Sequence, residues 1–187
     1  DFWIFGGIFR PVYLERVPTA FLDRVSVDGK ADGSFKALAH VALPNLKNAR
    51  FSVEAQLYDQ AGKPVGDLLE GAKTNENNEP VKKSGNTATK STNKQEVFLL
   101  EGTYRNIHRW TPETPNLYKI RFPLKSGGKI IHQVEKRIGF RTVEVRQRDG
   151  IYVNGVKIKF KGVNHHSFWP STGRTTSRQM SIDDVLM

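Results

Sequence analysis

The stretch FSVEAQLY, residues 51–58, places an apolar side chain at every second position. Because successive side chains of an extended chain point to opposite faces, this period of two predicts a β-strand with one buried face. The same alternation occurs at 35–43 and 118–124, and shorter apolar series predict strands at 25–27 and 97–99. Many short strands separated by turn signals favour a β-sandwich.

Two glycine-containing turns predict hairpins in the second half of the chain. Gly127-Gly128 separates one strand from another near 129–136. Asn154-Gly155 lies in the middle of residues 151–158, and both residues tolerate the positive φ of a type I′ turn.

The C-terminal region has a different pattern. A strand predicted at 158–164 runs into His165 and His166, a polar loop follows, and Ser181 is the predicted N-cap of a helix with Asp184 three residues on. Strand, loop and helix in this order form the first unit of an α/β repeat. Such folds place active sites just beyond the carboxyl ends of strands, so both histidines are candidates for lining a site.

The composition is that of a globular chain without cysteine. The 187 residues carry a formal net charge of +10, but the basic residues are scattered. No motif interleaves them with base-stacking aromatic residues, so a solvated surface or a domain contact is favoured over nucleic-acid binding. No apolar run approaches the roughly 20 residues of a membrane-spanning helix. The lack of cysteine excludes disulfides and thiolate metal sites and leaves the compartment open.

Three further segments lie outside the sandwich pattern. Residues 73–95 are polar and predict a mobile loop, the alternative being a loop that reaches a neighbouring domain or a substrate. Gly6-Gly7 predicts a turn before a strand at 8–14. The chain begins without Met or a signal pattern and ends inside a predicted helix, so we expect a fragment of a larger protein.

The sequence lacks a convincing catalytic motif. A glycosidase needs two carboxyl groups beside the scissile bond, one protonated and one ionised. Glu54, Glu135 and Glu144 are interpreted as solvent-exposed strand residues. Asp183 and Asp184 are interpreted as residues at the start of a helix, where its dipole favours a negative charge. There is also no GxSxG, HExxH or phosphate-binding glycine motif.

Several short motifs occur in an order that resembles a known family. Residues 110–118 read WTPETPNLY, in which the prolines fix the approach to a strand and Trp110 is expected to bury a large face. Gly139-Phe140-Arg141, Asn154-Gly155 and KGVNHH at 161–166 follow, and the chain opens with DFW at 1–3 and GIFRPVYL at 7–14. Together these motifs resemble glycoside hydrolase family 2, the family of bacterial β-galactosidases, β-glucuronidases and β-mannosidases, over essentially the whole chain.

The resemblance implies a mainly β fold in three parts. Residues 1–17 would be the tail of a sugar-binding jelly roll, 18–140 an immunoglobulin-like β-sandwich, and 141–187 the truncated start of a catalytic (β/α)8 barrel. The parent would be a retaining enzyme whose acid/base and nucleophile glutamates lie on later barrel strands. This chain is therefore expected to hold no catalytic residue.

Four residues are candidates for substrate binding. The resemblance implies that His166, the histidine of GVN-x-H, contributes to the sugar pocket, and Asn164 belongs to the same motif. Asp1 matches an aspartate that in β-galactosidases helps to shape the sugar and monovalent-cation site. Trp169 is interpreted either as a stacking platform for a sugar ring or as a core residue. The resemblance implies no cofactor in this chain and Mg²⁺ and Na⁺ in the parent.

Two functions are open for the sandwich. As a spacer it would fix the jelly roll against the barrel. A carbohydrate-binding module would need an exposed row of aromatic residues, and the Phe and Tyr fall mainly at inward positions. The parent is expected to be a β-galactosidase, with β-glucuronidase or β-mannosidase as alternatives. Its partners would be its other domains, a β-glycoside and further copies of itself, in a bacterial periplasm or cytoplasm.

Overall fold

The computed structural model describes residues 6–43, 50–74, 94–162 and 164–187. Its contacts divide the chain into two compact units, one formed by residues 17–158 and the other by residues up to Arg16 together with 159–187. The predicted site residue Asp1 and most of the predicted polar loop, residues 75–93, lie outside the described residues.

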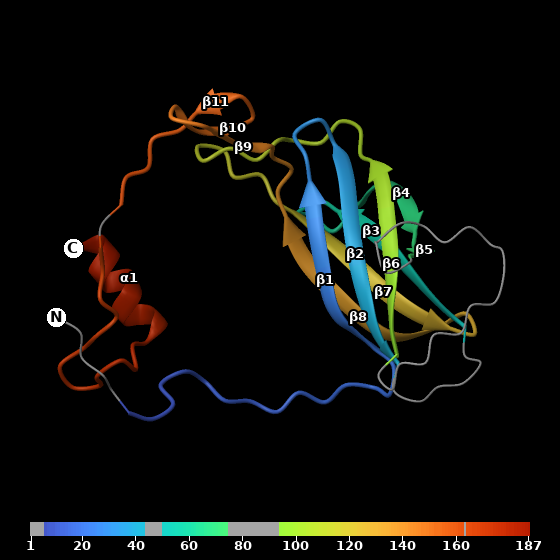
Figure 1. Ribbon diagram of the computed structural model, residues 1–187, viewed down its shortest axis with the longest axis horizontal. Helices are drawn as coiled ribbons and strands as arrows, with labels where there is room; N and C mark the ends of the chain where they lie inside the picture. The colour runs from blue at the N-terminus through green and yellow to red at the C-terminus, as the bar shows by residue number, and fades with distance from the viewer. Residues whose placement is uncertain (1–5, 44–49, 75–93, 163) are drawn as a thin grey trace. The chain divides into compact units, whose positions relative to one another are not determined.

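The larger unit is a sandwich of two antiparallel four-stranded sheets (Figure 1). The first sheet has the order β1 (Phe21–Gly29), β2 (Ser34–Leu43), β6 (Lys94–Thr103), β5 (Ala72–Lys73). The second has the order β4 (Pro64–Glu70), β3 (Phe51–Tyr58), β7 (Tyr118–Ser126), β8 (Lys129–Ile138). The mainly β fold class is confirmed.

The alternating residues of the predicted strands form the core. Val53 pairs with Leu124 and Leu57 with Ile120 across β3 and β7, and all four side chains are buried. Each such side chain contributes about 1.5 to 3 kcal/mol through burial. The inward residues of β2, β3 and β7 belong to one cluster that fills the space between the sheets.

Aromatic rings close one end of this core. Phe35 contacts Tyr104, Tyr104 contacts Phe140, and Phe140 contacts Tyr118, with ring centroids 5.6, 5.8 and 5.7 Å apart. The rings meet nearly edge to face, the arrangement that their quadrupoles favour. The chain of rings links β2 to the segments that follow β6 and β8.

Two histidines on the strands of the sandwich make structural contacts. His40 lies on β2, 3.0 Å from the Arg24 guanidinium, and burial lowers its pKa. His132 lies on β8, and its Nδ1 accepts a hydrogen bond of 3.2 Å from the backbone N–H of Leu22 on β1. Because β1 and β8 are edge strands of different sheets, this bond helps to close one side of the sandwich.

The hydroxyl of Tyr104 is buried and has no hydrogen-bond partner among the described residues. Burial raises its pKa to about 12. Because this value exceeds the unfolded pKa of about 10, the titration of this group leaves the free energy of unfolding unchanged below pH ~10 and lowers it as the pH rises from ~10 toward ~12.

We expect Tyr104→Phe to raise the free energy of unfolding at pH 7 by about 1 kcal/mol, because it removes an unpaired buried hydroxyl. The control is Tyr118→Phe, since the Tyr118 hydroxyl accepts a 2.7 Å hydrogen bond from the backbone of His108. That control should lower stability by about 1 kcal/mol. Urea unfolding at pH 7 and 10.5 measures both, and equal destabilisation by the two changes would contradict the expectation.

Both predicted glycine turns are confirmed. Gly127 and Gly128 have φ of +56° and +79° between β7 and β8. Asn154 and Gly155 have φ of +52° and +81° and join β10 (Gly150–Val153) to β11 (Val156–Lys157). These strands and β9 (Val143–Arg146) form a separate three-stranded sheet, which the contacts group with the sandwich, beyond the predicted boundary at residue 140.

Two predicted strands outside the sandwich are wrong. Residues 8–14 form no strand, and neither do the described residues of 158–164. An isolated extended segment gains no ladder hydrogen bonds, and the described chain offers neither segment a neighbouring strand. The first residues of the predicted polar loop, Lys73 and Thr74, instead pair with β6.

The predicted helix exists but begins earlier. α1 spans Arg178–Leu186, and its N-cap is Ser177, not Ser181. The Ser177 hydroxyl accepts a hydrogen bond from the backbone of Met180, and the Met180 sulfur accepts one from the backbone of Ser177. Ser181 lies inside the helix, where its hydroxyl donates to the carbonyl of Ser177.

Candidate functional site

The predicted sugar-binding residues that the structure describes lie in the smaller unit. Asn164 and His166 are exposed, and Trp169 is half-buried. No hydrogen bond or ring contact joins these three side chains in the described part of the chain. Their roles in binding, like that of Asp1, stay predictions.

Trp169 is held by a turn of its own backbone. Its N–H donates to the carbonyl of Gly173, and the N–H of Gly173 donates back, both at 2.8 Å. Gly173 has a φ of +59°, a conformation that costs glycine little. The turn fixes the position of the tryptophan backbone, and its half-buried ring leaves both the stacking and the core interpretation open.

His165 makes a contact that the sequence pattern did not indicate. Its Nε2 lies 2.8 Å from Oδ2 of Asp184, which ties the loop before Trp169 to α1. Asp184 was expected to serve in a helix cap, but α1 begins at Arg178 and places it in the last turns. The two residues are far apart in the sequence, so a periodic pattern of neighbouring residues could not predict their contact.

Residues from three of the sequence motifs meet at one end of the sandwich. The side chain of Asn154 donates to the carbonyl of Trp110 and accepts from the backbone of Thr142, each at 2.9 Å. The N–H of Trp110 donates to the carbonyl of Phe140, and the Arg141 guanidinium lies 4.4 Å from the centre of the Trp110 ring. We call this group, Trp110, Phe140, Arg141, Thr142 and Asn154, the Asn154 junction.

Gly139 allows the Asn154 junction to close. A Cβ at this position would lie 2.8 Å from Cβ and Cδ1 of Trp110, nearer than side chains pack. Trp110 is therefore half-buried against a glycine backbone, as its predicted structural role requires. The Asn154 junction fastens the β9–β11 sheet to the sandwich through hydrogen bonds that a flexible linker would lack.

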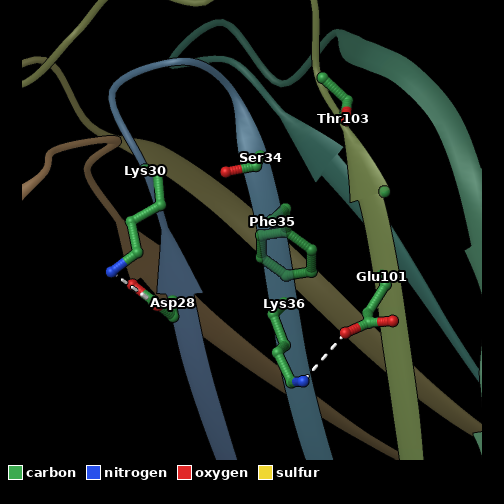
Figure 2. Close-up of a pocket in the computed structure, with 8 residues that line it drawn as sticks. Asp28, Lys30, Ser34, Phe35, Lys36, Glu101 and Thr103 are labelled. Atoms are coloured by element: carbon green, nitrogen blue, oxygen red, sulfur yellow. Dashed lines mark ion pairs between the residues drawn. The ribbon is translucent and has the colours of Figure 1, made fainter.

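A hollow on the first sheet has two carboxylates but not the pair that a glycosidase requires. It encloses about 520 Å³, and Asp28 and Glu101 line it from the strands on either side of β2 (Figure 2). Lys30 lies 3.0 Å from Asp28, and Lys36 lies 3.0 Å from Glu101. Each carboxylate is more than half exposed and paired with a lysine, so neither lies in the buried, apolar surroundings that an acid catalyst requires.

Among the residues that the structure describes, three acidic side chains have a clearly shifted pKa, and all three shifts are downward. Hydrogen bonds from Ser34 lower the pKa of Asp32, and one from Arg121 lowers that of Glu135. A hydrogen bond from Lys157, followed by one from Tyr152, lowers the pKa of Asp149. A general acid needs the opposite shift.

Metal binding has no support in the described residues. Residues 6–43, 50–74, 94–162 and 164–187 contain no group of three or more His, Cys, Asp or Glu that could hold an ion. The Mg²⁺ and Na⁺ expected for a parent enzyme stay predictions for that enzyme. Within the same part of the chain, no helix has the length and apolarity needed to span a bilayer.

Comparison with known proteins places the sandwich in a family. The family described as Glycosyl hydrolases family 2 matches residues 24–141. A beta-galactosidase of Lactobacillus delbrueckii subsp. bulgaricus is 30% identical over 191 residues, which cover 99% of this chain and 16% of that protein. The chain spans a fifth or less of the length of the curated relatives it matches.

Solved structures share the fold. Bacteroides uniformis beta-glucuronidase 2, covalently bound to cyclophellitol-6-carboxylate aziridine, has a TM-score of 0.66 at 18% identity and covers 91% of this chain and 20% of its own. A beta-glycosidase from Bacteroides vulgatus has a TM-score of 0.63 at 20% identity, with 90% and 20% covered.

Proposed function

This chain belongs to glycosyl hydrolases family 2, and on that premise we propose that it is the non-catalytic sandwich of a longer retaining glycosidase. In this proposal the sandwich holds a sugar-binding part and a catalytic part in fixed positions. The longer enzyme hydrolyses terminal β-glycosides with two carboxyl groups that lie outside this chain.

The Asn154 junction is the observation that carries the proposal. Its hydrogen bonds tie the β9–β11 sheet, which leads toward residue 159, to the end of the sandwich. A site assembled from several parts loses rate steeply when its parts are misplaced by about 1 Å, so a rigid connection favours catalysis. The motif residues of the sandwich thus have a mechanical role in the proposal and no chemical one.

The substrate of the longer enzyme is proposed to be a β-galactoside, with β-glucuronides and β-mannosides as alternatives. Relatives named beta-galactosidase support the first, and the structural likeness to a beta-glucuronidase keeps the second open. Asp1, Asn164, His166 and Trp169 would contact the sugar. Mg²⁺, Na⁺ and self-assembly belong to the proposal for the longer enzyme only.

A carbohydrate-binding module is the alternative for the isolated chain. Sugar-binding sheets present aromatic rings to solvent, whereas the exposed large aromatic residues in the described part of the chain lie outside the sandwich strands: Phe9, Tyr13, Phe160 and Phe168. Most aromatic rings of the sandwich fill its core instead. The spacer role is favoured for this reason.

We expect the 187-residue chain to release no chromophore from nitrophenyl β-galactoside, β-glucuronide or β-mannoside, because it lacks an acid and a nucleophile in one site. Calorimetric titration with millimolar oligosaccharides of the same sugars should give no heat of binding. The L. delbrueckii beta-galactosidase, assayed in parallel, confirms that the assay works.

The double variant Asp28→Asn, Glu101→Gln separates genuine activity from contamination. Turnover that the wild-type chain shows and this variant lacks would place catalysis in the hollow lined by Asp28 and Glu101 and overturn the proposal. Binding heat without turnover would favour the carbohydrate-binding module. The spacer role requires that neither turnover nor heat of binding is detected.

A further inference from the structure

A second hollow on the sandwich contains two arginines without a carboxylate partner. It encloses about 410 Å³, and Arg137 and Arg141 line it together with Lys30 and Asp28. Lys30 lies 3.0 Å from Asp28, so these two charges offset each other. Among the described residues, no carboxylate lies within ion-pair distance of either arginine. This hollow, which we call the arginine hollow, therefore carries two uncompensated positive charges.

The strand that carries Arg137 cannot neutralise it. Glu135 is the one acidic residue of β8. Its carboxylate lies 2.9 Å from the Arg121 guanidinium and 3.9 Å from the Lys119 ammonium, so it is already paired with two cations. Lys119 is also the cross-strand neighbour of Arg137 on β7, which adds a further cation beside it. A negative charge for Arg137 must therefore come from a ligand.

Arg141 is held in position before any ligand binds. Its guanidinium lies 4.4 Å from the centre of the Trp110 ring, and its backbone N–H donates to the carbonyl of Gly29 at 3.0 Å. Stacking uses the face of a guanidinium, whereas its N–H donors point outward in the plane of the group. Arg141 thus keeps its donors and loses little conformational freedom when it binds an anion.

The rest of the arginine hollow suits an organic ligand. Four apolar residues also line it: Val27, Leu117, Ile138 and Val143. Apolar walls reduce the screening of nearby charges, so they strengthen the attraction of the arginines for an anion. A volume of about 410 Å³ lies in the range of pockets that bind small organic molecules, and a bare inorganic ion would fill only part of it.

We propose that the arginine hollow binds a small organic phosphate monoester, with Arg137 and Arg141 on its phosphate group and the apolar walls against its carbon skeleton. A phosphate monoester carries about −1.5 to −2 charges at pH 7, which match two guanidinium groups. The planar fork of arginine also fits phosphate oxygens in pairs. A carboxylate brings a single charge and would leave one guanidinium uncompensated. The proposal goes beyond the spacer role and does not depend on it.

Calorimetric titration of the 187-residue chain with glucose 6-phosphate at low salt tests the proposal. We expect saturable binding with a Kd of about 1 mM or tighter at pH 7.5. Arg137→Gln should weaken it at least about tenfold, because it removes one of the two charges. Arg141→Lys keeps the charge but loses the fork, so it should weaken binding as well. At pH 5 the ester loses about half its charge, and binding should weaken several-fold.

Arg105→Gln is the matched control. Arg105 is exposed, has no ion pair within the described residues and does not line the arginine hollow, so its replacement should leave the Kd unchanged. Thermal unfolding establishes that each variant folds. If Arg141→Lys did not fold, Arg137→Gln alone would decide, because Arg137 is exposed and makes no side-chain contact within the described residues.

Three results would overturn the proposal. The first is the absence of saturable binding, and the second is a Kd that Arg137→Gln leaves unchanged. The third is equally tight binding of a second probe. Equal affinity for inorganic phosphate would mean that the apolar walls contribute nothing, and equal affinity for glucuronic acid would mean that one charge suffices. The nitrophenyl glycosides carry no phosphate ester, so their assay tests the spacer role separately.

Discussion

Replacing Gly33 by alanine should lower the free energy of unfolding of the sandwich by about 3 to 4 kcal/mol. Gly33 has a φ of +89° in the turn between β1 and β2, a conformation that L-residues rarely adopt. A Cβ at this position would also overlap the carbonyl oxygen of Tyr104, which is backbone and cannot rotate away. The N–H of Tyr104 donates to the carbonyl of Gly33 at 2.9 Å, so relief of the overlap would break this hydrogen bond.

Gly62→Ala is the control for Gly33→Ala. Gly62 has a similar φ of +81°, but its Cβ would meet no atom within 4 Å. The control should therefore cost only about 1 kcal/mol, the penalty of the backbone conformation alone. Urea unfolding followed by tryptophan fluorescence measures both variants. Equal losses for the two would mean that the contact with Tyr104 contributes nothing.

Phe140→Ala should destabilise the sandwich by about 3 to 5 kcal/mol, the usual cost of removing a fully buried aromatic ring. Phe140 is 0% exposed and contacts both Tyr104 and Tyr118. Its removal would leave a cavity between the two tyrosines at the end of the core where the Asn154 junction lies. The variant should unfold at a clearly lower urea concentration than the wild-type chain.

The same side-chain change at an exposed position separates burial from composition. Phe160 is 71% exposed, so Phe160→Ala should change the free energy of unfolding by less than about 0.5 kcal/mol. If Phe140→Ala were as mild as Phe160→Ala, the ring at 140 could not be part of the core. A large effect in both would indicate that Phe160 is covered in solution.

The strands of the sandwich were predictable because each carries its own signal. A period of two at 51–58 or 118–124 identifies a half-buried strand without knowledge of its partners, and the structure places strands there. The pairs Gly127-Gly128 and Asn154-Gly155 marked hairpins because few residues adopt positive φ at low cost. In these cases local chemistry and the global fold agree.

The strands expected at 8–14 and 158–164 failed for a physical reason. A β-strand is stabilised by hydrogen bonds to a neighbouring strand. An alternation of apolar residues indicates only that a segment could form a strand if such a neighbour were present. The cap of α1 was misplaced because serines occur at both 177 and 181, and only the backbone geometry decides which of them begins the helix.

The candidate site was likewise predictable only in part. Motif order in the sequence identified the family, and it located Trp110, Arg141 and Asn154 without revealing what they do. The tertiary structure decided that these residues, far apart in sequence, bond to one another, and that Asp28 and Glu101 are neutralised by lysines. The contact between His165 and Asp184 likewise could not be predicted from the periodicity of the sequence.

The sequence by itself determined which segments of this protein have one apolar face, where the chain turns, and which family it resembles, because these properties depend on neighbouring residues. Only the tertiary structure decided which segments gain a partner and which charges are compensated. Pairing and burial depend on contacts between distant residues, and no local pattern specifies them.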